Sequence, residues 1–367
     1  MGNVPHLRFP EFSGEWQKCK LGDLCNVLMC KRILASQTNT EDGVPFYKIG
    51  TIGSTPDAYI SKELFDDYKV KYNYPHKGEV MITCAGTVGK CVVYDGEDAY
   101  FQDSNIVWID NPTQNISNGF LFHLLSKVDW RKLNSTTIIR IYNDDLRNLK
   151  MSYPQKEEQQ KISHLLSLLD ERITTQNKII EKLQSLIKGL RVCCMQRVYG
   201  NNVYLSEIAQ IYQPQTISST ELTEDGFLVY GANGIIGKYK DYNHETEQIC
   251  ITCRGNTCGM VNYTKPMSWI TGNAMVINTD KYQDKVCKRY LYHYLSAYNF
   301  NSIISGSGQP QIVRTPLEKL KITLPTISEQ KQKAMIFDKI QDKIDINHKV
   351  LNLYIGQKQY LLRQMFI

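Results

Sequence analysis

Two stretches of this chain carry a heptad pattern of apolar residues. After Pro154, apolar side chains recur at alternating steps of four and three residues, and the same pattern returns after Pro325. A pattern of this period predicts a long helix that packs along another helix. The first seam comprises Ile162, Leu166, Leu169, Ile173, Ile180, Leu183, Ile187, Leu190 and Cys194, and the second Phe337, Ile340, Ile344, Leu351, Tyr354, Leu361 and Met365, less regularly at Lys333 and Lys358.

An amide side chain interrupts both seams at the same position, Gln176 in the first and Asn347 in the second. A polar residue on a seam costs stability, but it fixes the register when it meets a polar partner. Two interpretations stay open: the amides bind each other, or each faces solvent at the edge of its stripe. The two helices most simply pack on each other, and an antiparallel pair would carry one module at each end with approximate twofold symmetry.

The regions before the two seams mix short β-like runs with turn signals. The apolar runs at residues 79–84 and 248–253 end at Ala85-Gly86 and Arg254-Gly255, as buried strands followed by turns do. Near the end of each region, one stretch (119–133 and 288–302) has the apolar period of a helix. These patterns predict two α+β modules.

The modules and their helices form one duplicated unit. Four short segments recur in the same order: Thr40 to Gly43 at Thr223 to Gly226, Thr83-Cys84 at Thr252-Cys253, His123 to Ser126 at His293 to Ser296, and Pro154 with Glu158-Gln159 at Pro325 with Glu329-Gln330. The period is far too long for a solenoid repeat. We therefore predict two similar mixed α/β modules at residues 1–153 and 200–324, a central helix at 154–199, and a C-terminal helix at 325–367 that pairs with it as an antiparallel coiled coil.

The charge of the chain is concentrated on the predicted helices. The net charge is +6, but residues 1–150 hold 17 basic against 18 acidic side chains, and residues 201–320 hold 10 against 10. The excess lies in residues 151–200 (8 against 5) and 321–367 (8 against 4). Composition alone therefore argues only moderately for nucleic-acid binding. The 11 cysteines have no framework spacing, and no run is apolar enough to span a membrane, so we expect a cytoplasmic protein.

No catalytic motif is found in the sequence, which has neither a GxxxxGK[ST] loop nor a GxGxxG fingerprint. The pair Cys250 and Cys253 has the spacing of metal ligands, but residues three apart in a strand point to opposite faces, so we interpret both as core residues. His123 and His293 share a helix position and have no carboxylate pattern nearby, and we interpret them as structural. We expect no metal site and no enzymatic activity in this chain.

The loops of the two modules are the candidate DNA-binding surfaces. Cationic and amide side chains read phosphates and base edges, and glycines allow close approach of the backbone. The alternative for the glycines is ordinary hairpin turn chemistry. The candidates are Lys31, Arg32, Lys48, Thr51, Ser54, Lys90, Arg140 and Asn143 in the first module, and Tyr230, Asn233, Lys238, Tyr239, Arg254, Asn256, Gln309, Gln311 and Arg314 in the second.

Several segments resemble those of the specificity subunit of type I restriction–modification systems. They are the opening Leu7-Arg8-Phe9-Pro10-Glu11-Phe12 with Trp16 and Leu21 to Leu24, the Ile-Thr-x-x-Gly segments at Ile82 and Ile251, and the two Pro-x-x-x-Glu-Gln segments. The resemblance covers nearly the whole chain. It implies two target-recognition domains that bind the halves of a split, asymmetric DNA site, and a coiled coil that holds two modification subunits.

The resemblance also assigns the chemistry to partner subunits. Modification subunits would bind S-adenosylmethionine and methylate adenine, and restriction subunits would use ATP and magnesium to translocate and cut DNA, so we expect no cofactor on this chain. A helix of about 40 residues is about 60 Å long, which fits half-site centres one DNA turn apart, roughly 34 Å. The alternatives are a stand-alone DNA-modifying enzyme with duplicated domains and a two-headed scaffold that binds proteins.

Overall fold

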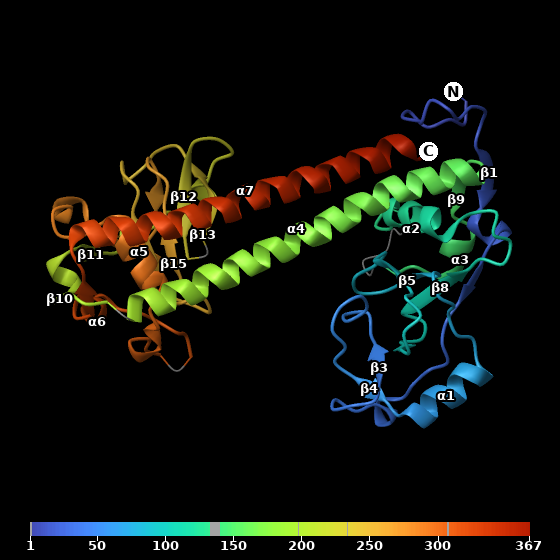
Figure 1. Cartoon of the computed structure of the whole chain (residues 1–367), viewed down its shortest axis with the longest axis horizontal. Helices are drawn as coiled ribbons and strands as arrows, with labels where there is room; N and C mark the ends of the chain where they lie inside the picture. Colours follow the sequence, from blue (N-terminus) through green and yellow to red (C-terminus); the bar gives the residue numbers. More distant parts are fainter. Residues whose placement is uncertain (1, 133–139, 197, 233, 307) are drawn as a thin grey trace. The chain divides into compact units, whose positions relative to one another are not determined.

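The computed structural model describes residues 2–132, 140–196, 198–232, 234–306 and 308–367. The chain falls into two compact units, Met1–Thr175 with Leu351–Ile367, and Gln176–Val350. Each unit contains one globular head and parts of two long helices, α4 (Lys156–Gln196) and α7 (Ile327–Met365). We call the globular part before α4 head 1 and the globular part between α4 and α7 head 2; both are visible in Figure 1.

In the described residues, head 1 has two small sheets, a terminal strand pair and three α-helices. Its four-stranded sheet has the order β2-β8-β5-β6, its three-stranded sheet the order β4-β3-β7, and β1 pairs with β9. Its elements are β1 (Gln17–Lys20), β2 (Asn26–Leu28), β3 (Val44–Tyr47), β4 (Tyr59–Ile60), α1 (Lys62–Lys71), β5 (Val80–Thr83), β6 (Cys91–Val93), β7 (Tyr100–Phe101), β8 (Ile106–Asp110), α2 (Asn118–Lys127), α3 (Asn143–Arg147) and β9 (Lys150–Tyr153).

Head 2 repeats this topology strand for strand. The sheet orders are β11-β17-β14-β15 and β13-β12-β16, and β10 pairs with β18. In both heads the three-stranded sheet contains an antiparallel and a parallel pair. Its elements are β10 (Asn201–Tyr204), β11 (Gln210–Tyr212), β12 (Phe227–Gly231), β13 (Gly234–Tyr239), β14 (Ile249–Thr252), β15 (Val261–Tyr263), β16 (Trp269–Ile270), β17 (Ala274–Asn278), α5 (Lys288–Ala297), α6 (Arg314–Glu318) and β18 (Lys321–Leu324).

The predicted fold class, duplicated mixed α/β modules with two long helices, is confirmed by these two topologies. The helical stretches predicted at residues 119–133 and 288–302 are shorter than expected. Helix α2 ends at Lys127 and α5 at Ala297, because Val128 and Tyr298 adopt extended backbone angles. Residue 133 lies outside the described residues.

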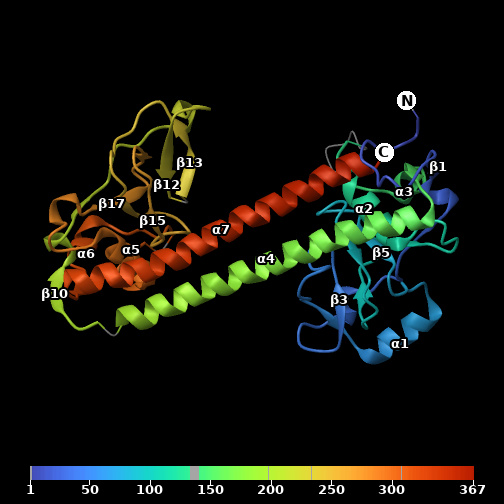
Figure 2. The same cartoon turned by 45° about the horizontal axis from the view of Figure 1, so that its top comes forward.

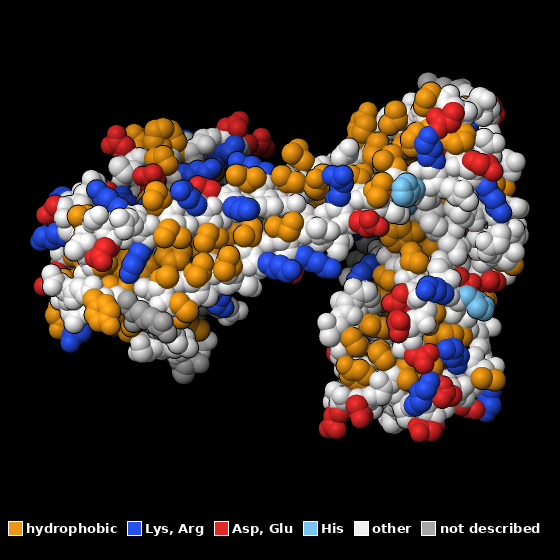
Figure 3. All heavy atoms as spheres, in the orientation of Figure 1, with side chains coloured by type: hydrophobic (Ala, Val, Ile, Leu, Met, Phe, Trp, Pro, Cys, Tyr) orange, Lys and Arg blue, Asp and Glu red, His pale blue; other side chains and the backbone are white. Residues whose placement is uncertain are grey.

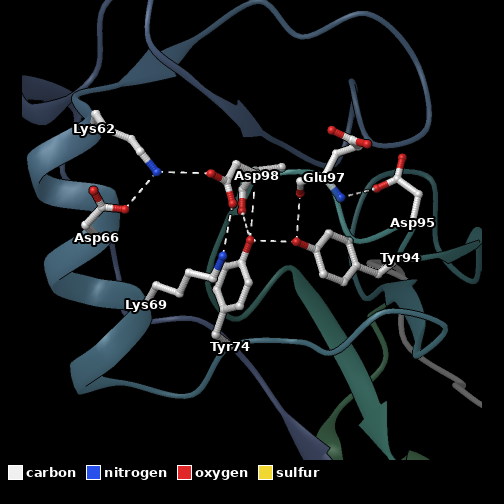
Figure 4. Close-up of polar contacts among 9 residues, drawn as sticks. Lys62, Asp66, Lys69, Tyr74, Tyr94, Asp95, Glu97 and Asp98 are labelled. Atoms are coloured by element: carbon white, nitrogen blue, oxygen red, sulfur yellow. Dashed lines mark hydrogen bonds and ion pairs between the residues drawn. The ribbon is translucent and has the colours of Figure 1, made fainter.

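Helix α1 is the main difference between the heads. Thr40 and Thr223 lie farther apart in the sequence than Thr83 and Thr252, because the segment between these repeats is longer in head 1, where it includes α1. Figure 4 shows how α1 is held: Lys62 and Lys69 both bind Asp98, at 3.0 and 2.9 Å. The Tyr74 hydroxyl lies 2.8 Å from that of Tyr94. The shared aspartate and the tyrosine pair connect α1 and the segment after it to the segment between β6 and β7.

The central strand of each head is buried on both faces. All four residues of β5 and all four of β14 are buried. In head 1, apolar residues of β5 and β8 pack on α2, and the core also includes Met365 and Phe366 from the end of α7. Phe366 stacks on Phe120 with ring centroids 4.8 Å apart. In head 2 the corresponding place is taken by Met195, near the end of α4. Each head is therefore completed by the helix that follows the other head in the sequence.

Helices α4 and α7 lie side by side and antiparallel (Figures 1 and 2). The predicted seam residues are buried or half-buried, and the residues between them are mostly exposed. Lys358 does not leave a gap in the seam, because its ammonium binds the carboxylate of Asp170 on α4. The apolar seam therefore includes one ion pair in the first unit.

The two seam amides contact each other. The Gln176 amide donates to the side-chain oxygen of Asn347 at 2.5 Å and to its carbonyl oxygen at 3.1 Å. Of the two interpretations left open by the sequence, the structure shows the pairing. In an antiparallel pair of equivalent helices, only the residue nearest the local twofold axis meets its own counterpart. The amides therefore mark the register in which α4 and α7 cross.

Candidate nucleic-acid interface

In each head, several loops lie together along the edge of the four-stranded sheet that is formed by the ends of its strands. Because neighbouring strands of this sheet are antiparallel, the end of β5 lies beside the start of β8 and the start of β6. In head 1, Cys84 N–H donates to Asn105 O at 2.8 Å, and Ile141 N–H donates to Cys84 O at 2.9 Å. In head 2, Cys253 makes the same two bonds, with Asn273 O at 3.1 Å and Ile312 N–H at 3.0 Å. We call this edge the loop edge of each head.

Most of the candidate residues of head 1 lie at its loop edge, and several are already paired. Arg32 binds Asp103 at 2.8 Å, and the Lys90 ammonium donates to Ile52 O at 2.5 Å. Lys48 binds Asp57 at 2.9 Å, and Arg140 donates to Ser104 O at 3.1 Å. The Lys48–Asp57 ion pair is exposed on both sides, and such pairs contribute only about 0–1 kcal/mol. Asp103 is largely buried, and Lys90 and Arg140 donate to backbone carbonyls rather than to carboxylates.

The remaining candidates of head 1 shape the loops. The Thr51 hydroxyl accepts from Lys48 N–H at 3.1 Å, and the Ser54 hydroxyl donates to Thr51 O at 2.8 Å, so both close the turn after β3. Lys31 lies over the ring of Tyr72, 5.4 Å from its centroid. Asn143 is the first residue of α3 and is half-buried. Thr51 and Ser54 thus act on the loop conformation rather than as free hydrogen-bonding groups.

In head 2, Arg254, Asn256, Gln309 and Gln311 lie together at the loop edge. Arg254 and Gln311 form an isolated antiparallel bridge, and Gly255 N–H donates to Pro310 O at 3.0 Å. Arg254, Asn256 and Gln309 are exposed, and Gln311 is half-buried. One guanidinium and three amides therefore share one surface, a combination that suits base edges.

The other candidates of head 2 lie elsewhere. Lys238 and Tyr239 pair with Leu228 and Phe227 at the far end of the β12–β13 hairpin, where Lys238 binds Asp225 at 3.5 Å. Tyr230 is buried, and its hydroxyl accepts from Lys265 N–H at 3.1 Å. The turn of this hairpin lies beside the end of β14, because the Thr252 hydroxyl donates to Ala232 O. Lys238 and Tyr239 lie at the open end of the hairpin and are not part of the Arg254 cluster.

Two candidates of head 2 remain. Arg314 begins α6, and its guanidinium binds Glu318 at 2.7 Å within that helix. Asn233 lies outside the described residues. The loop-edge cluster of head 2 is thus defined by Arg254 and the three amides beside it.

Sequence reasoning missed Gln213 at the loop edge of head 2. Its amide donates to Gly272 O at 3.1 Å and to the Cys253 sulfur at 3.2 Å, which ties three loops together. The segment after β11 corresponds to the Lys31-Arg32 segment after β2, but the spacing of the repeats is larger there than at the later motifs. Aligning the strands rather than the later motifs would have revealed it.

The two Pro-x-x-x-Glu-Gln segments hold each head on its helix. The buried Gln159 amide donates to Pro154 O at 2.8 Å and Asn115 O at 2.9 Å, and its oxygen accepts from Ser117 N–H at 2.6 Å. Gln330 likewise donates to Pro325 O and Lys285 O and accepts from Cys287 N–H at 2.8 Å. Since Ser117 and Cys287 cap α2 and α5, each glutamine joins the start of a long helix to the start of a short one.

His293, which we interpret from the sequence as structural, contacts a carboxylate that is distant in the sequence. Its Nε2 lies 2.8 Å from Asp338 of α7, and its Nδ1 accepts from Arg191 of α4 at 3.1 Å. Arg289 also binds Asp338, at 2.6 Å. Burial lowers the pKa of His293, and the two bonds describe a neutral ring that bridges both long helices. His123 is 1% exposed and lies near the Lys358–Asp170 ion pair rather than in a hydrogen bond to a carboxylate, and burial lowers its pKa to about 4.

Cys250 and Cys253 are both fully buried but belong to different core clusters, as expected for opposite faces of β14. Burial raises the pKa of Cys250 to about 12, so its thiol stays protonated at neutral pH. Among the residues that the structure describes, no group of three or more His, Cys, Asp or Glu side chains has a metal-binding arrangement. Within the same residues, no helix is long and apolar enough to cross a membrane.

The two heads share one topology, and each presents polar side chains at its loop edge. The model of the type I restriction modification DNA specificity domain matches residues 13–185 and again 201–353. The chain therefore belongs to this family and contains its specificity domain twice.

Individual relatives agree with this assignment. A Haemophilus influenzae protein assigned as a type I restriction enzyme specificity subunit is 49% identical over 169 residues, which is 46% of this chain and 43% of that protein. This alignment thus spans less than half of that relative. The specificity subunit of the type I restriction enzyme MjaVIII of Methanocaldococcus jannaschii is 23% identical over 94% of this chain and 89% of its own length.

A solved structure shares the fold over almost the whole chain. The specificity subunit of a type I restriction–modification system from M. genitalium superposes with a TM-score of 0.67 and 18% identity, covering 99% of both chains. A second structure, of a type I restriction–modification assembly, gives a TM-score of 0.54 with 15% identity and 98% coverage of both chains. At these identities the likeness concerns the fold alone.

Proposed function

We propose that this chain is the DNA-recognition subunit of a type I restriction–modification complex, and that its heads bind the two halves of a split, asymmetric site. The observation that carries the proposal is the shared loop edge: the same backbone contacts recur in both heads, but the side chains presented there differ. Head 1 presents Lys90 and Arg140, and head 2 presents Arg254 and Gln311. Two equal frames with unequal side chains are suited to two different half-sites.

The paired helices would set the distance between the half-sites. Helix α4 has 41 residues, hence a length of about 60 Å at 1.5 Å per residue. Half-site centres one DNA turn apart, roughly 34 Å, fit within this length. The Gln176–Asn347 contact supports a fixed register, since a slipped pair would leave a buried amide without its partner.

The same helices would dock two modification subunits. Large apolar side chains lie exposed beside the seam: Ile179 (38%), Leu186 (50%) and Ile336 (55%) in the second unit, and Leu353 (72%) and Tyr360 (53%) in the first. Figure 3 shows such hydrophobic side chains gathered along the helices. Exposed apolar stripes of this kind are typical of protein–protein interfaces. Restriction subunits would join through the modification subunits.

Catalysis would belong entirely to these partners. On this proposal S-adenosylmethionine, ATP and magnesium bind the modification and restriction subunits, and this chain binds none of them. Purified alone, it should neither methylate nor cut DNA. Activity of the chain alone would favour the alternative of a stand-alone enzyme.

The decisive experiment is to co-express the chain with its modification subunit and map methylated adenines by sequencing. We expect two short defined blocks of different sequence, separated by a fixed unspecified gap. Methylation of one contiguous palindrome, or of no site, would contradict the proposal. Leu353→Asp should release the modification subunit in co-purification, while Asn352→Asp, a change at the exposed neighbouring position, should not. Equal retention by both variants would remove the docking role of the apolar stripe.

A further inference from the structure

Equivalent backbone hydrogen bonds define which residues of the two loop edges correspond to each other. Ile141 N–H binds Cys84 O in head 1 as Ile312 N–H binds Cys253 O in head 2. The residues next to these partners therefore correspond: Ala85 to Arg254, and Arg140 to Gln311. This correspondence depends on the topology of the loops, not on similarity of the side chains.

Each head places one arginine at this corresponding spot, but from opposite loops. In head 1 the β5–β6 loop contributes Ala85 and the segment before α3 contributes Arg140. In head 2 the β14–β15 loop contributes Arg254 and the segment before α6 contributes Gln311. Both heads therefore have one guanidinium at this place, but a different loop supplies it in each head. The backbone hydrogen bonds are the same in both heads, so they do not depend on which loop supplies the arginine. Holding the backbone alone would therefore not explain why both heads have an arginine here.

A neighbouring carbonyl shows a second exchange. Ser104 and Gly272 correspond, since each precedes the residue whose carbonyl accepts from Cys84 or Cys253. In head 1 the Ser104 carbonyl accepts from Arg140 at 3.1 Å, and in head 2 the Gly272 carbonyl accepts from Gln213 at 3.1 Å. Gln213 therefore donates in head 2 to the carbonyl that corresponds to the one bound by Arg140 in head 1. The donor to this carbonyl in head 2 is thus not Arg254.

The backbone of Arg254 and of the residue after it is hydrogen-bonded to the facing loop, and the space beside Gly255 is open. The bridge from Arg254 to Gln311 and the bond from Gly255 N–H to Pro310 O fix the loop on both sides. Gly255 has a φ of +83°, which favours glycine, and a side chain added there would meet no atom within 4 Å. A reading side chain on a fixed backbone with open space beside it can approach a base edge closely.

We propose that Arg254 reads a guanine in the second half-site, with Gln311 beside it on the neighbouring base pair, and that Arg140 occupies the corresponding reading position in head 1. This assignment rests on the proposed function. The guanidinium fork matches the O6 and N7 acceptors of guanine, and an amide matches adenine. Each head thus reads from the same place with an arginine supplied by a different loop.

The test uses the assembled complex with its modification subunits and a panel of duplexes that vary one base pair at a time. Arg254→Ala should lower discrimination at one base pair of one half-site by about 5- to 150-fold, and leave the other half-site unchanged. Arg254→Lys should relax the same position, because an ammonium keeps the charge but not the fork. Arg140→Lys should relax a position of the other half-site. Lys281→Ala, an exposed cation of head 2 away from the loop edge, is the matched control.

The outcomes separate the two proposals. If the wild-type complex methylates a split site but Arg254→Ala weakens methylation evenly, without relaxing any position, the arginine contacts phosphate and the inference fails alone. Full restoration of discrimination by Arg254→Lys would overturn it in the same way, as would relaxation of both half-sites by one substitution. If the wild-type complex has no split site, the proposed function fails and this inference with it. Because Arg254 is exposed, thermal unfolding of its variants should match that of the wild type.

Discussion

Replacing the Gln176–Asn347 pair by two leucines should stabilise the coiled coil, although each single replacement should not. The asymmetry follows from burial: Gln176 is 8% exposed, whereas Asn347 is half-buried. Asn347→Leu removes the side-chain acceptor of the buried Gln176 amide, which keeps only its longer bond to the Asn347 carbonyl oxygen, and we expect a cost of about 1–3 kcal/mol. Gln176→Leu leaves Asn347 open to water, with its amide still bound to Lys343 O at 2.6 Å. We expect that variant to stay near wild-type stability.

The double variant leaves no orphaned amide. Burying a leucine side chain stabilises by about 1.5–3 kcal/mol, against the loss of hydrogen bonds that contribute about 1–2 kcal/mol in total. We therefore expect a net gain of up to about 2 kcal/mol, and a departure from additivity of about 1 kcal/mol or more. The gain would come with a weaker preference for this register, because the amides no longer penalise a slipped pair.

Differential scanning calorimetry of the purified chain can follow the transition of the second unit, Gln176–Val350. For a unit of about 150–250 residues, a change of about 1 kcal/mol shifts the midpoint by about 2–4 °C. Asn177→Leu, at the adjacent exposed amide, is the control and should change little. The reasoning is refuted if Asn347→Leu costs no more than Gln176→Leu, or if the double variant equals the sum of the singles.

Three further changes test other parts of the structure. Acidification from pH 6.5 to about 4 should destabilise the first unit by about 3 kcal/mol. Burial lowers the pKa of His123 in the folded state to about 4, so the unfolded chain binds the proton first as the pH falls. His123→Leu should flatten the pH dependence of stability measured by thermal unfolding. Gln159→Ala should cost about 2–4 kcal/mol because it removes three hydrogen bonds from buried groups, whereas Gln160→Ala at the exposed neighbour should cost little, and equal midpoints would contradict the role assigned to Gln159. Phe366→Ala should cost the first unit about 3–5 kcal/mol and leave the calorimetric transition of the second unchanged; a shift of both transitions would argue against separate cores.

The sequence predicted those features that depend on local periodicity. The heptad seams define the long helices, and the shared position of Gln176 and Asn347 raised their pairing as one of two options. The duplication extended each prediction from one head to the other. These signals are readable because a helix seam and a repeat each leave a regular spacing in the chain.

The loop edges could not be predicted in the same way. Arg254 and Gln311 are neighbours only because a strand pair closes between residues far apart in the sequence. The same holds for His293 and Asp338, which contact each other across two helices. Conversely, Lys238 looked close to the interface because it follows Tyr230 in one loop-like segment, but the β12–β13 hairpin carries it to the opposite end. At this site, closeness in the sequence therefore does not predict closeness in the structure.

The position of Phe366 has a consequence for how the protein is made on the ribosome. Head 1 is synthesised first, yet the Trp16–Phe120 pair gains its third ring from Phe366, which is translated only after α7. Until then, the nascent head exposes an apolar gap where that end of the helix will lie. Domains usually fold in the order of their synthesis. In this chain the first head to emerge is the last to be completed, because its core includes Met365 and Phe366.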